Sequence, residues 1–468
     1  MTEHPDLAVL GGGPAGYVAA LRAARLGADV VLIEKERVGG TCLNVGCIPT
    51  KALTTSTELL LKARRAHEFG LAIPTVAADL PALMDFKQGA VDALVHGVEH
   101  LLREAGVTLL RGEGHLTAPT TVRVQPGMGE AIAVAARQVI LAPGSITARP
   151  AIPGLDLPGV ITSTEALDIS EVPARLIVVG GGVIGLEFAC IYEALGSQVT
   201  VVEMMPTLLP GGTDESLAKR LAVLLRRRGM GIVTGAQVLG VVSTGSGLAA
   251  TYRDATGAVS HVEGDRVLAA MGRWPNTEGL GLAEVGVKMN GRAIDVDEHL
   301  AAGVPNMWAI GDAVGGLMLA HKAMVDGRVA AENALGARRV VDYRSVPNVV
   351  FTRPEVASVG LTEMQARHRG ADVKVAQFPF SANPRARLLG EMDGLVKLVC
   401  EAGSGVVLGV HLMGPDATGL IAEGALAVQI GATADDLAWT THAHPTLAEA
   451  MLEAALGFRN ATIHFHTR

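Results

Sequence analysis

Short apolar runs alternate along the chain with glycine-rich turns and helical segments. The apolar run at 7–10 predicts a buried strand, and a glycine-rich segment at 11–16 follows it directly. A helical pattern then extends through Arg25, and a second apolar run at 29–34 predicts the next strand. The order strand, glycine turn, helix and strand is typical of a βαβ unit.

The same unit returns later in the chain. An apolar run at 175–179 leads into a glycine-rich segment at 180–185, a helical pattern and a strand at 198–203. In both copies an acidic residue, Glu34 or Glu203, follows the first glycine by the same 23 positions (34 − 11 and 203 − 180). This shared spacing predicts two Rossmann-like nucleotide-binding domains built on one plan, and therefore an α/β protein.

Proline and glycine mark the predicted crossings between domains. The first crossing follows Pro143 and Gly144, and the second lies at 272–277. The segment from about Ser345 mixes strand and helix patterns and contains no glycine turn of the nucleotide type. We therefore expect the first nucleotide-binding domain at 1–148, the second at 149–272, the remainder of the first, central domain at 273–344, and an α+β domain at 345–468.

The composition agrees with a globular enzyme. Of the 468 residues, 49% are hydrophobic and 18% are charged, which excludes a disordered chain. A net charge of −8 gives no reason to expect nucleic acid or a membrane surface as a partner. The first residues lack the basic start of a secretory signal, so we expect a cytoplasmic protein. Four cysteines do not form a disulfide scaffold, and Cys190 and Cys400 stand alone in apolar contexts as packing residues.

Both glycine-rich segments follow the pattern G-x-G-x-x-G. The first glycine makes a tight turn, the second lets a pyrophosphate approach the backbone, and the third lets the helix pack closely on the strand. One such pattern could be a plain glycine turn, but two copies, each within a βαβ unit with its acid, favour two nucleotide sites. The glycines concerned are Gly11, Gly13 and Gly16 in the first copy and Gly180, Gly182 and Gly185 in the second.

The acidic residue of each unit is expected to accept hydrogen bonds from ribose hydroxyls. In the second copy, the carboxylate of Glu203 would repel a 2′-phosphate. The residues that follow it, Met204 and Met205, provide no arginine to bind such a phosphate. These residues favour NAD over NADP.

Cys42 and Cys47 lie five positions apart, after the first βαβ unit. Two thiols at this spacing at a helix start can close a disulfide, and a helix N-terminus favours the thiolate that reacts in disulfide exchange. Half a metal site and two buried thiols are the alternatives. Zinc sites need further Cys or His ligands and no second cysteine pair exists, so the spacing favours a redox pair and no metal.

The segment at 39–51, GGTCLNVGCIPTK, resembles the redox motif of the pyridine nucleotide–disulfide oxidoreductases. The resemblance covers essentially the whole chain and includes both glycine turns, GDA at 311–313 and HPTLAE at 444–449. Within that family the chain is most similar to the dihydrolipoamide dehydrogenases, flavoproteins that reoxidise the dihydrolipoyl groups of 2-oxoacid dehydrogenase and glycine-cleavage systems. Glu203, AHKA at 320–323 and SANPRA at 381–386 carry this closer similarity.

The resemblance implies that the first domain binds FAD and the second NAD. Glu34 would contact the adenosine ribose of FAD, and Asp312 the ribityl or phosphate region. Cys47 would lie against the flavin ring in a charge-transfer contact, while Cys42 would exchange with the substrate. Gly144 and Gly272 are expected as further cofactor contacts.

The resemblance also gives roles to residues that have plain alternatives. Lys51 and Glu187 would pair near the flavin N5, and the backbone at Ala320 and His321 would stabilise negative charge on the reduced flavin. Without the resemblance, these residues would be a surface lysine, a helix-surface glutamate and a strand-end turn.

His444 and Glu449 bracket a predicted helix start. In one interpretation Thr446 and Glu449 form a capping box, in which Glu449 reaches back to the Thr446 N–H and His444 is only a turn residue. The resemblance implies instead that His444, oriented by Glu449, is the base that takes a proton from the dithiol. The family places this histidine in the active site of the partner subunit, so an obligate homodimer is expected, with the last domain as the dimerisation domain. His442 matches a family position but has no assigned role.

The implied reaction oxidises protein-bound dihydrolipoyl groups through the Cys42–Cys47 disulfide and FAD and reduces NAD+, with a lipoyl-bearing protein as partner. Glutathione-type reductases share the architecture but use NADPH, which Glu203 argues against. Mercuric reductases carry a C-terminal cysteine pair that this chain does not have. A further alternative is a flavin-binding scaffold protein without catalytic activity, and the intact cysteine pair and acid–base pair argue against it. One departure is Ala-Pro-Gly at 142–144 in place of the usual Ala-Thr-Gly, since proline lacks a backbone donor.

Overall fold

The computed structural model describes residues 4–465 of the chain. Its first sheet has five parallel strands in the order β20-β7-β1-β2-β3. The central strands are buried along their whole length, which explains why their sequences are continuous apolar runs. The strands are β1 (Leu7–Leu10), β2 (Val30–Glu34), β3 (Thr108–Arg111), β7 (Gln138–Leu141) and β20 (Met307–Ala309).

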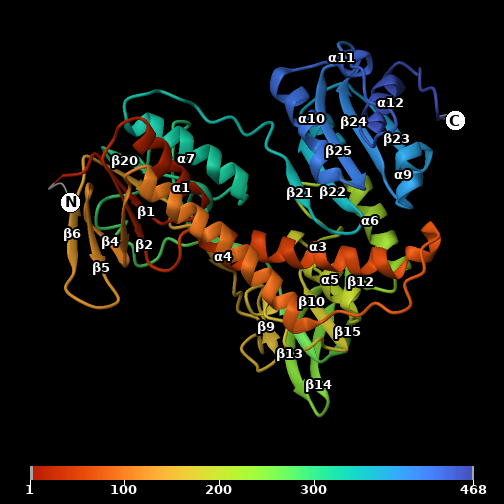
Figure 1. Ribbon diagram of the computed structural model, residues 1–468, viewed down its shortest axis with the longest axis horizontal. Helices are drawn as coiled ribbons and strands as arrows, with labels where there is room; N and C mark the ends of the chain where they lie inside the picture. The colour runs from red at the N-terminus through yellow and green to blue at the C-terminus, as the bar shows by residue number, and fades with distance from the viewer. Residues whose placement is uncertain (1–3, 466–468) are drawn as a thin grey trace.

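The helices of this part of the chain include α1 (Pro14–Arg25), α3 (Cys47–Arg64), α4 (Leu80–Glu104) and α7 (Ala320–Ala334). Helices α1 and α7 pack against each other (Figure 1). Their contact is close because Gly327 has no side chain, and a Cβ there would lie 2.4 Å from the Ala15 carbonyl oxygen. Helix α3 passes beneath the C-terminal domain in this view and packs against α5 (Val183–Leu195) of the second fold.

The second sheet repeats the first. Its order is β12-β11-β10-β16-β9, so β10 holds the central place that β1 holds in the first sheet. Each sheet is accompanied by a three-stranded antiparallel sheet, β4-β5-β6 in the first fold and β13-β14-β15 in the second. The repeat predicted from the glycine turns therefore extends beyond the βαβ units. The additional elements are β4 (Glu113–Ala118), β5 (Thr121–Gln125), β6 (Ile132–Ala135), β9 (Val160–Ile161), β10 (Arg175–Val179), β11 (Gln198–Glu203), α6 (Glu215–Arg227), β12 (Gly231–Thr234), β13 (Gln237–Thr244), β14 (Gly247–Arg253), β15 (Val259–Gly264) and β16 (Arg266–Ala269).

The C-terminal domain, blue in Figure 1, is built on an antiparallel sheet in the order β21-β22-β25-β24-β23. Apolar residues of this sheet and of four helices, α9, α10, α11 and α12, share one buried core. The predicted fold class, two Rossmann-like domains plus an α+β domain, is confirmed. The elements are β21 (Asn348–Val350), β22 (Glu355–Gly360), α8 (Glu363–His368), β23 (Val373–Pro379), α9 (Pro384–Leu389), β24 (Leu395–Glu401), β25 (Val407–Gly414), α10 (Ala417–Ile430), α11 (Ala434–Trp439) and α12 (Glu449–Phe458).

Two short strands, β8 (Ser145–Thr147) and β17 (Arg273–Pro275), pair where the chain leaves the first fold and returns to it. The boundaries proposed at 148 and 272 adjoin this pair, and the four-part division remains a proposal. A further short pair, β18 (Met289–Asn290) with β19 (Ala293–Ile294), follows the return. Between residues 4 and 465, no helix is long and apolar enough to cross a membrane.

Gly16→Ala is expected to destabilise the first fold. The added Cβ would lie 1.8 Å from the Gly11 carbonyl oxygen, so the turn or the helix must move, which costs about 1–3 kcal/mol. Gly13→Ala is the matched control, because a Cβ there meets only the Gly40 Cα, at 3.9 Å, and Gly13 has an ordinary φ of −69°. Urea unfolding of the two flavin-free proteins measures the difference, and equal midpoints would contradict the close-packing argument.

Candidate active site

One cavity of about 1660 Å³ extends between the two nucleotide-binding folds. Both glycine turns line it, and so do the two thiols of the cysteine pair. The predicted site residues that line it are Gly11, Gly13, Glu34, Cys42, Cys47, Lys51, Gly144, Gly180, Gly182, Glu187, Glu203, Gly272, Asp312 and Ala320. The third glycines of the turns, Gly16 and Gly185, lie against the backbone of the first glycines instead. His444 and Glu449 belong to the C-terminal domain and do not line the cavity.

Glu34 and Glu203 hold the glycine turns in the same way in both folds. One oxygen of Glu34 accepts the N–H of Gly12 at 2.7 Å, and the other accepts the N–H two residues beyond Glu34 at 2.8 Å. Glu203 makes the same two bonds, with Gly181 at 2.5 Å and with the N–H two residues further along at 2.6 Å. Each buried carboxylate is thus oriented by two backbone donors and keeps lone pairs for ribose hydroxyls.

The glycine turns leave space for phosphates at the starts of two helices. Gly13 and Gly182 are the N-cap residues of α1 and α5. In the direction of a side chain, Gly13 faces only the Gly40 Cα at 3.9 Å, and Gly182 has no atom within 4 Å. A Cβ at either position would project into this space, and the helix N–H groups attract phosphate. The residues present therefore fit a dinucleotide in each fold.

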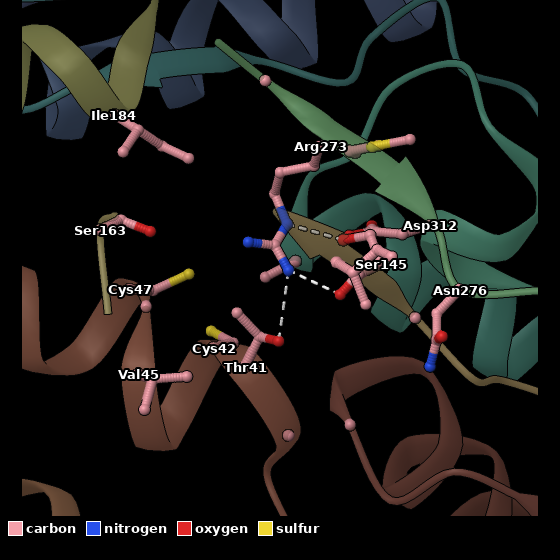
Figure 2. Close-up of a pocket in the computed structure, with 18 of the residues that line it drawn as sticks. Thr41, Cys42, Val45, Cys47, Ser145, Ser163, Ile184, Arg273, Asn276 and Asp312 are labelled. Carbon is pink, nitrogen blue, oxygen red and sulfur yellow. Dashed lines mark hydrogen bonds between the residues drawn. The ribbon is translucent and has the colours of Figure 1, made fainter. Parts of the chain in front are cut away.

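Asp312 lies in the short 3-10 helix Gly311–Val314 and meets two residues that were not predicted as site residues. Its Oδ2 accepts the Ser145 hydroxyl at 2.5 Å. Arg273 donates to the Ser145 Oγ at 2.7 Å, to the Ser145 carbonyl at 2.6 Å and to the Thr41 hydroxyl at 3.4 Å (Figure 2). Burial lowers the pKa of Arg273, and the nearby Asp312 opposes this. The sequence signal at 272–277 indicated only a domain crossing, which is why Arg273 was missed.

Cys42 and Cys47 lie on two consecutive helices instead of at the start of one. Helix α2 (Gly40–Val45) ends at Gly46, whose φ of −144° and ψ of −111° break the helix, and α3 begins at Cys47. The Cys47 thiol is therefore at a helix N-terminus, where N–H groups favour a thiolate. Figure 2 shows both sulfur atoms beside the same space, with Thr41 and Arg273 nearby.

The two thiols differ in acidity. A hydrogen bond from the Cys42 thiol lowers the pKa of Cys47 to about 7, against the effect of burial and with further help from the Lys51 ammonium. The same hydrogen bond, together with burial, raises the pKa of Cys42. The arrangement favours a Cys47 thiolate beside a protonated Cys42.

Lys51 and Glu187 form an ion pair next to the thiols. The Lys51 Nζ lies 2.9 and 2.8 Å from the two Glu187 oxygens, and the Glu187 side chain is only 4% exposed. The pair connects α3, one turn after Cys47, to α5 of the second fold. A third residue, Phe351, donates its backbone N–H to Glu187 Oε1 at 3.0 Å. The predicted pairing of Lys51 with Glu187 is therefore present in the structure.

His444 and Glu449 are hydrogen-bonded, with 2.9 Å between Nδ1 and Oε1. The other Glu449 oxygen accepts the Thr446 N–H at 2.8 Å, which is one half of the predicted capping box. The predicted capping box is not formed, because the helix begins at Glu449 with Ala448 as its N-cap, and no helix N–H donates to the Thr446 hydroxyl, which itself donates to the Ala443 carbonyl. Burial would raise the pKa of Glu449, but the bonds from Thr446 and His444 outweigh it and lower the pKa. The His444 side chain is 69% exposed, so a single chain does not bring it to the cysteines.

Comparison with known families agrees with this geometry. Residues 5–327 match the family described as pyridine nucleotide-disulphide oxidoreductase, and residues 346–455 match its dimerisation domain. The chain belongs to the pyridine nucleotide-disulphide oxidoreductase family. Members of this family use FAD and NAD(H), and the chain is an FAD-dependent oxidoreductase.

Relatives within this family match the chain over nearly its whole length. It is 42% identical to the dihydrolipoyl dehydrogenase of Geobacillus stearothermophilus over 98% of this chain and 97% of that one. It is 44% identical to the dihydrolipoyl dehydrogenase of Thermus scotoductus over 99% of both chains. The crystal structure of LpdA from Mycobacterium tuberculosis superimposes with a TM-score of 0.88 at 32% identity, over 96% of this chain and 98% of that one.

The proline at 143, a departure from the usual family sequence, is accommodated through carbonyl groups. The Asn276 backbone N–H donates to the Gly144 carbonyl at 2.9 Å, and its side-chain amide donates to the Pro143 carbonyl at 3.2 Å. Proline keeps its carbonyl, so both contacts are made without the missing donor. The turn beside the cavity is therefore held by the residue that follows β17.

Cys42→Ala is expected to raise the pKa of the Cys47 thiol above about 7, because the thiolate loses the hydrogen bond that lowers its pKa most. The thiolate fraction at pH 7 then falls, and alkylation by iodoacetamide slows. Cys42→Ser is the matched control, since its hydroxyl keeps a donor and should give a smaller shift. The pH dependence of Cys47 alkylation, followed in the reduced proteins by peptide mass spectrometry, measures both shifts. An unchanged pKa in Cys42→Ala would contradict the donor role.

Proposed function

We propose that the chain is an NAD+-dependent dihydrolipoyl dehydrogenase. The observation that carries the proposal is the position of Cys42 and Cys47 in one cavity between two nucleotide cradles. The similarity to proteins named dihydrolipoyl dehydrogenase supports the substrate class. The overall reaction converts one dihydrolipoyl group and NAD+ into a lipoyl group, NADH and a proton.

The first fold holds FAD and the second holds NAD in this proposal. Glu34 would bind the adenosine ribose of FAD, Asp312 would bind the ribityl or phosphate region, and the N–H groups at the α7 N-terminus, at Ala320, would stabilise negative charge on the reduced flavin. When bound, FAD supplies the two-electron acceptor between the thiols and NAD+. Glu203 binds the ribose of NAD, and its carboxylate disfavours the 2′-phosphate of NADP. The exposed methionines that follow Glu203 support this choice, because they provide no cationic group for that phosphate.

The thiol chemistry follows from the different acidities of the two cysteines. His444, oriented by Glu449, takes a proton from one dihydrolipoyl thiol, and the resulting thiolate attacks the Cys42 sulfur of the oxidised pair. The Cys42–Cys47 bond breaks, and its electron pair stays on Cys47 as the thiolate. The second dihydrolipoyl thiol then displaces Cys42, which takes a proton, and the lipoyl ring closes. The Lys51 ammonium, which lowers the pKa of Cys47, stabilises the leaving thiolate, and the hydrogen bond from Cys42 adds to this once Cys42 is again a thiol.

The proposed active unit is a homodimer that receives a lipoyl-bearing protein. The match to a dimerisation domain supports the dimer. The exposed position of His444, outside the cavity of its own chain, supports a role in the site of the partner subunit. The lipoyl group would then reach Cys42 between the two subunits.

The purified protein is expected to contain FAD and to reduce NAD+ with dihydrolipoamide far faster than it reduces glutathione disulfide with NADPH. The reason is that the Glu203 carboxylate disfavours the 2′-phosphate of NADPH, and that His444 is proposed to take a proton from a dithiol. Turnover with both substrate pairs, measured side by side, tests this. Cys47→Ser is the control and should abolish turnover while FAD remains bound. Faster reduction of glutathione disulfide would refute the proposed substrate.

A mixed dimer tests whether His444 acts across the interface. Cys47→Ser and His444→Gln homodimers are each expected to be nearly inactive. A heterodimer of the two, isolated with two affinity tags, should regain about half of the wild-type activity, because one of its two sites combines an intact Cys47 with an intact His444 from the other subunit. If His444 acted within its own chain, both sites would lack a residue and the heterodimer would stay inactive.

A further inference from the structure

Phe351 follows β21 at the edge of the C-terminal sheet and lines the cavity. It makes two different contacts with the ion pair beside the thiols. The Lys51 Nζ lies over its ring, 4.6 Å from the centroid, and its backbone N–H donates to Glu187 Oε1 at 3.0 Å. One residue of the C-terminal domain therefore touches both members of a pair that joins the first and second folds.

The two contacts act on opposite charges. The face of an aromatic ring attracts an ammonium group, and a backbone N–H offsets part of the charge of a carboxylate. Both Glu187 oxygens bind the Lys51 Nζ, at 2.8 and 2.9 Å. The carboxylate therefore offsets part of the positive charge that the ammonium exerts on the Cys47 thiol. The Lys51 ammonium lowers the pKa of Cys47, whereas the Glu187 carboxylate raises it. The net change in the pKa of Cys47 thus depends on the positions of Lys51 and Glu187 relative to its sulfur atom.

We propose that Phe351 is a positioning residue that sets the electrostatic field at Cys47 by holding the Lys51–Glu187 pair from both sides. This inference rests on the proposed redox role of Cys47. It goes beyond that role because the position of the C-terminal domain, which carries Phe351, then contributes to the pKa of the Cys47 thiol. Cys47 is also affected by its burial, by the hydrogen bond from Cys42 and by the nearby charge of Arg273, and a substitution of Phe351 removes none of these groups.

Phe351→Leu separates the two contacts, since it removes the ring but keeps the backbone N–H. Without the ring the Lys51 ammonium is held less firmly, and the thiolate loses part of its stabilisation. The pKa of Cys47 should rise by about half a unit to one unit, the size expected for one cation–π contact. Two readouts measure it in the reduced holoenzyme, namely the pH dependence of Cys47 alkylation and that of the long-wavelength absorbance from the thiolate against the flavin.

Matched variants distinguish positioning from simple packing. Phe351→Tyr keeps an aromatic face and should titrate like the wild type. Val349→Ala removes apolar volume from the same cavity wall without removing an aromatic face, and it should also titrate like the wild type. An unchanged pKa in Phe351→Leu, or an equal rise in Val349→Ala, would overturn the proposal. If Phe351→Leu does not fold with FAD, Phe351→Met keeps the volume without the ring and must show the same rise.

These measurements need no dithiol substrate. A wild-type protein that fails to oxidise dihydrolipoamide would therefore refute the proposed function and leave the role of Phe351 open to the same titration. Conversely, a normal turnover of dihydrolipoamide with no shift in Phe351→Leu would overturn only the role of Phe351.

Discussion

The carboxylate of Glu187 is the buried charge on which the arrangement of the three parts of the chain depends. Its side chain is 4% exposed, and a carboxylate so far from water needs both an opposite charge and hydrogen-bond donors. Lys51 provides the charge from the helix that begins at Cys47, and Phe351 provides an N–H from the C-terminal domain. Removing either partner would leave the charge under-compensated. Helix α3, the second fold and the C-terminal sheet are therefore held in one relative position beside the two thiols.

A second buried charge strengthens the same junction from further away. Lys397 of β24, 3% exposed, binds Asp214 at the N-cap of α6 at 2.9 and 3.0 Å and Glu363 at 2.9 Å. Asp214 belongs to the second fold, whereas Lys397 and Glu363 belong to the C-terminal domain. Charge pairs with this degree of burial are specific in geometry, because a shifted neighbour leaves an unpaired charge and not merely a smaller apolar contact. These ion pairs thus fix the position of the C-terminal domain relative to the second fold.

The sequence was sufficient where the interacting groups are close along the chain or repeat. Glu34 binds the N–H of Gly12 and that of the residue two positions beyond itself, so a single βαβ unit contains the whole interaction, and its copy around Glu203 confirms the pattern. The sequence was insufficient where partners are distant. Arg273 meets Ser145 across 128 positions and Phe351 meets Glu187 across 164, and no periodicity connects such pairs. The cysteine spacing lies between these cases, because it indicated two adjacent thiols but not the helix break at Gly46 that places Cys47 alone at the start of α3.

Glu449 shows why a local pattern can be correct and still leave the function undetermined. One of its oxygens accepts the Thr446 N–H, the bond that the predicted capping box required, although the helix has Ala448 as its N-cap, and the other binds Nδ1 of His444. The bond from the Thr446 N–H orients the carboxylate, and the carboxylate in turn orients the imidazole, so one side chain makes the bonds that both interpretations of the sequence predicted. The local pattern does not place the imidazole relative to the cysteines, and His444 does not line the cavity that Cys42 and Cys47 line. Because His444 is 69% exposed and lies outside the cavity of its own chain, its proposed role as a base requires a second subunit, and the match to a dimerisation domain supports that requirement.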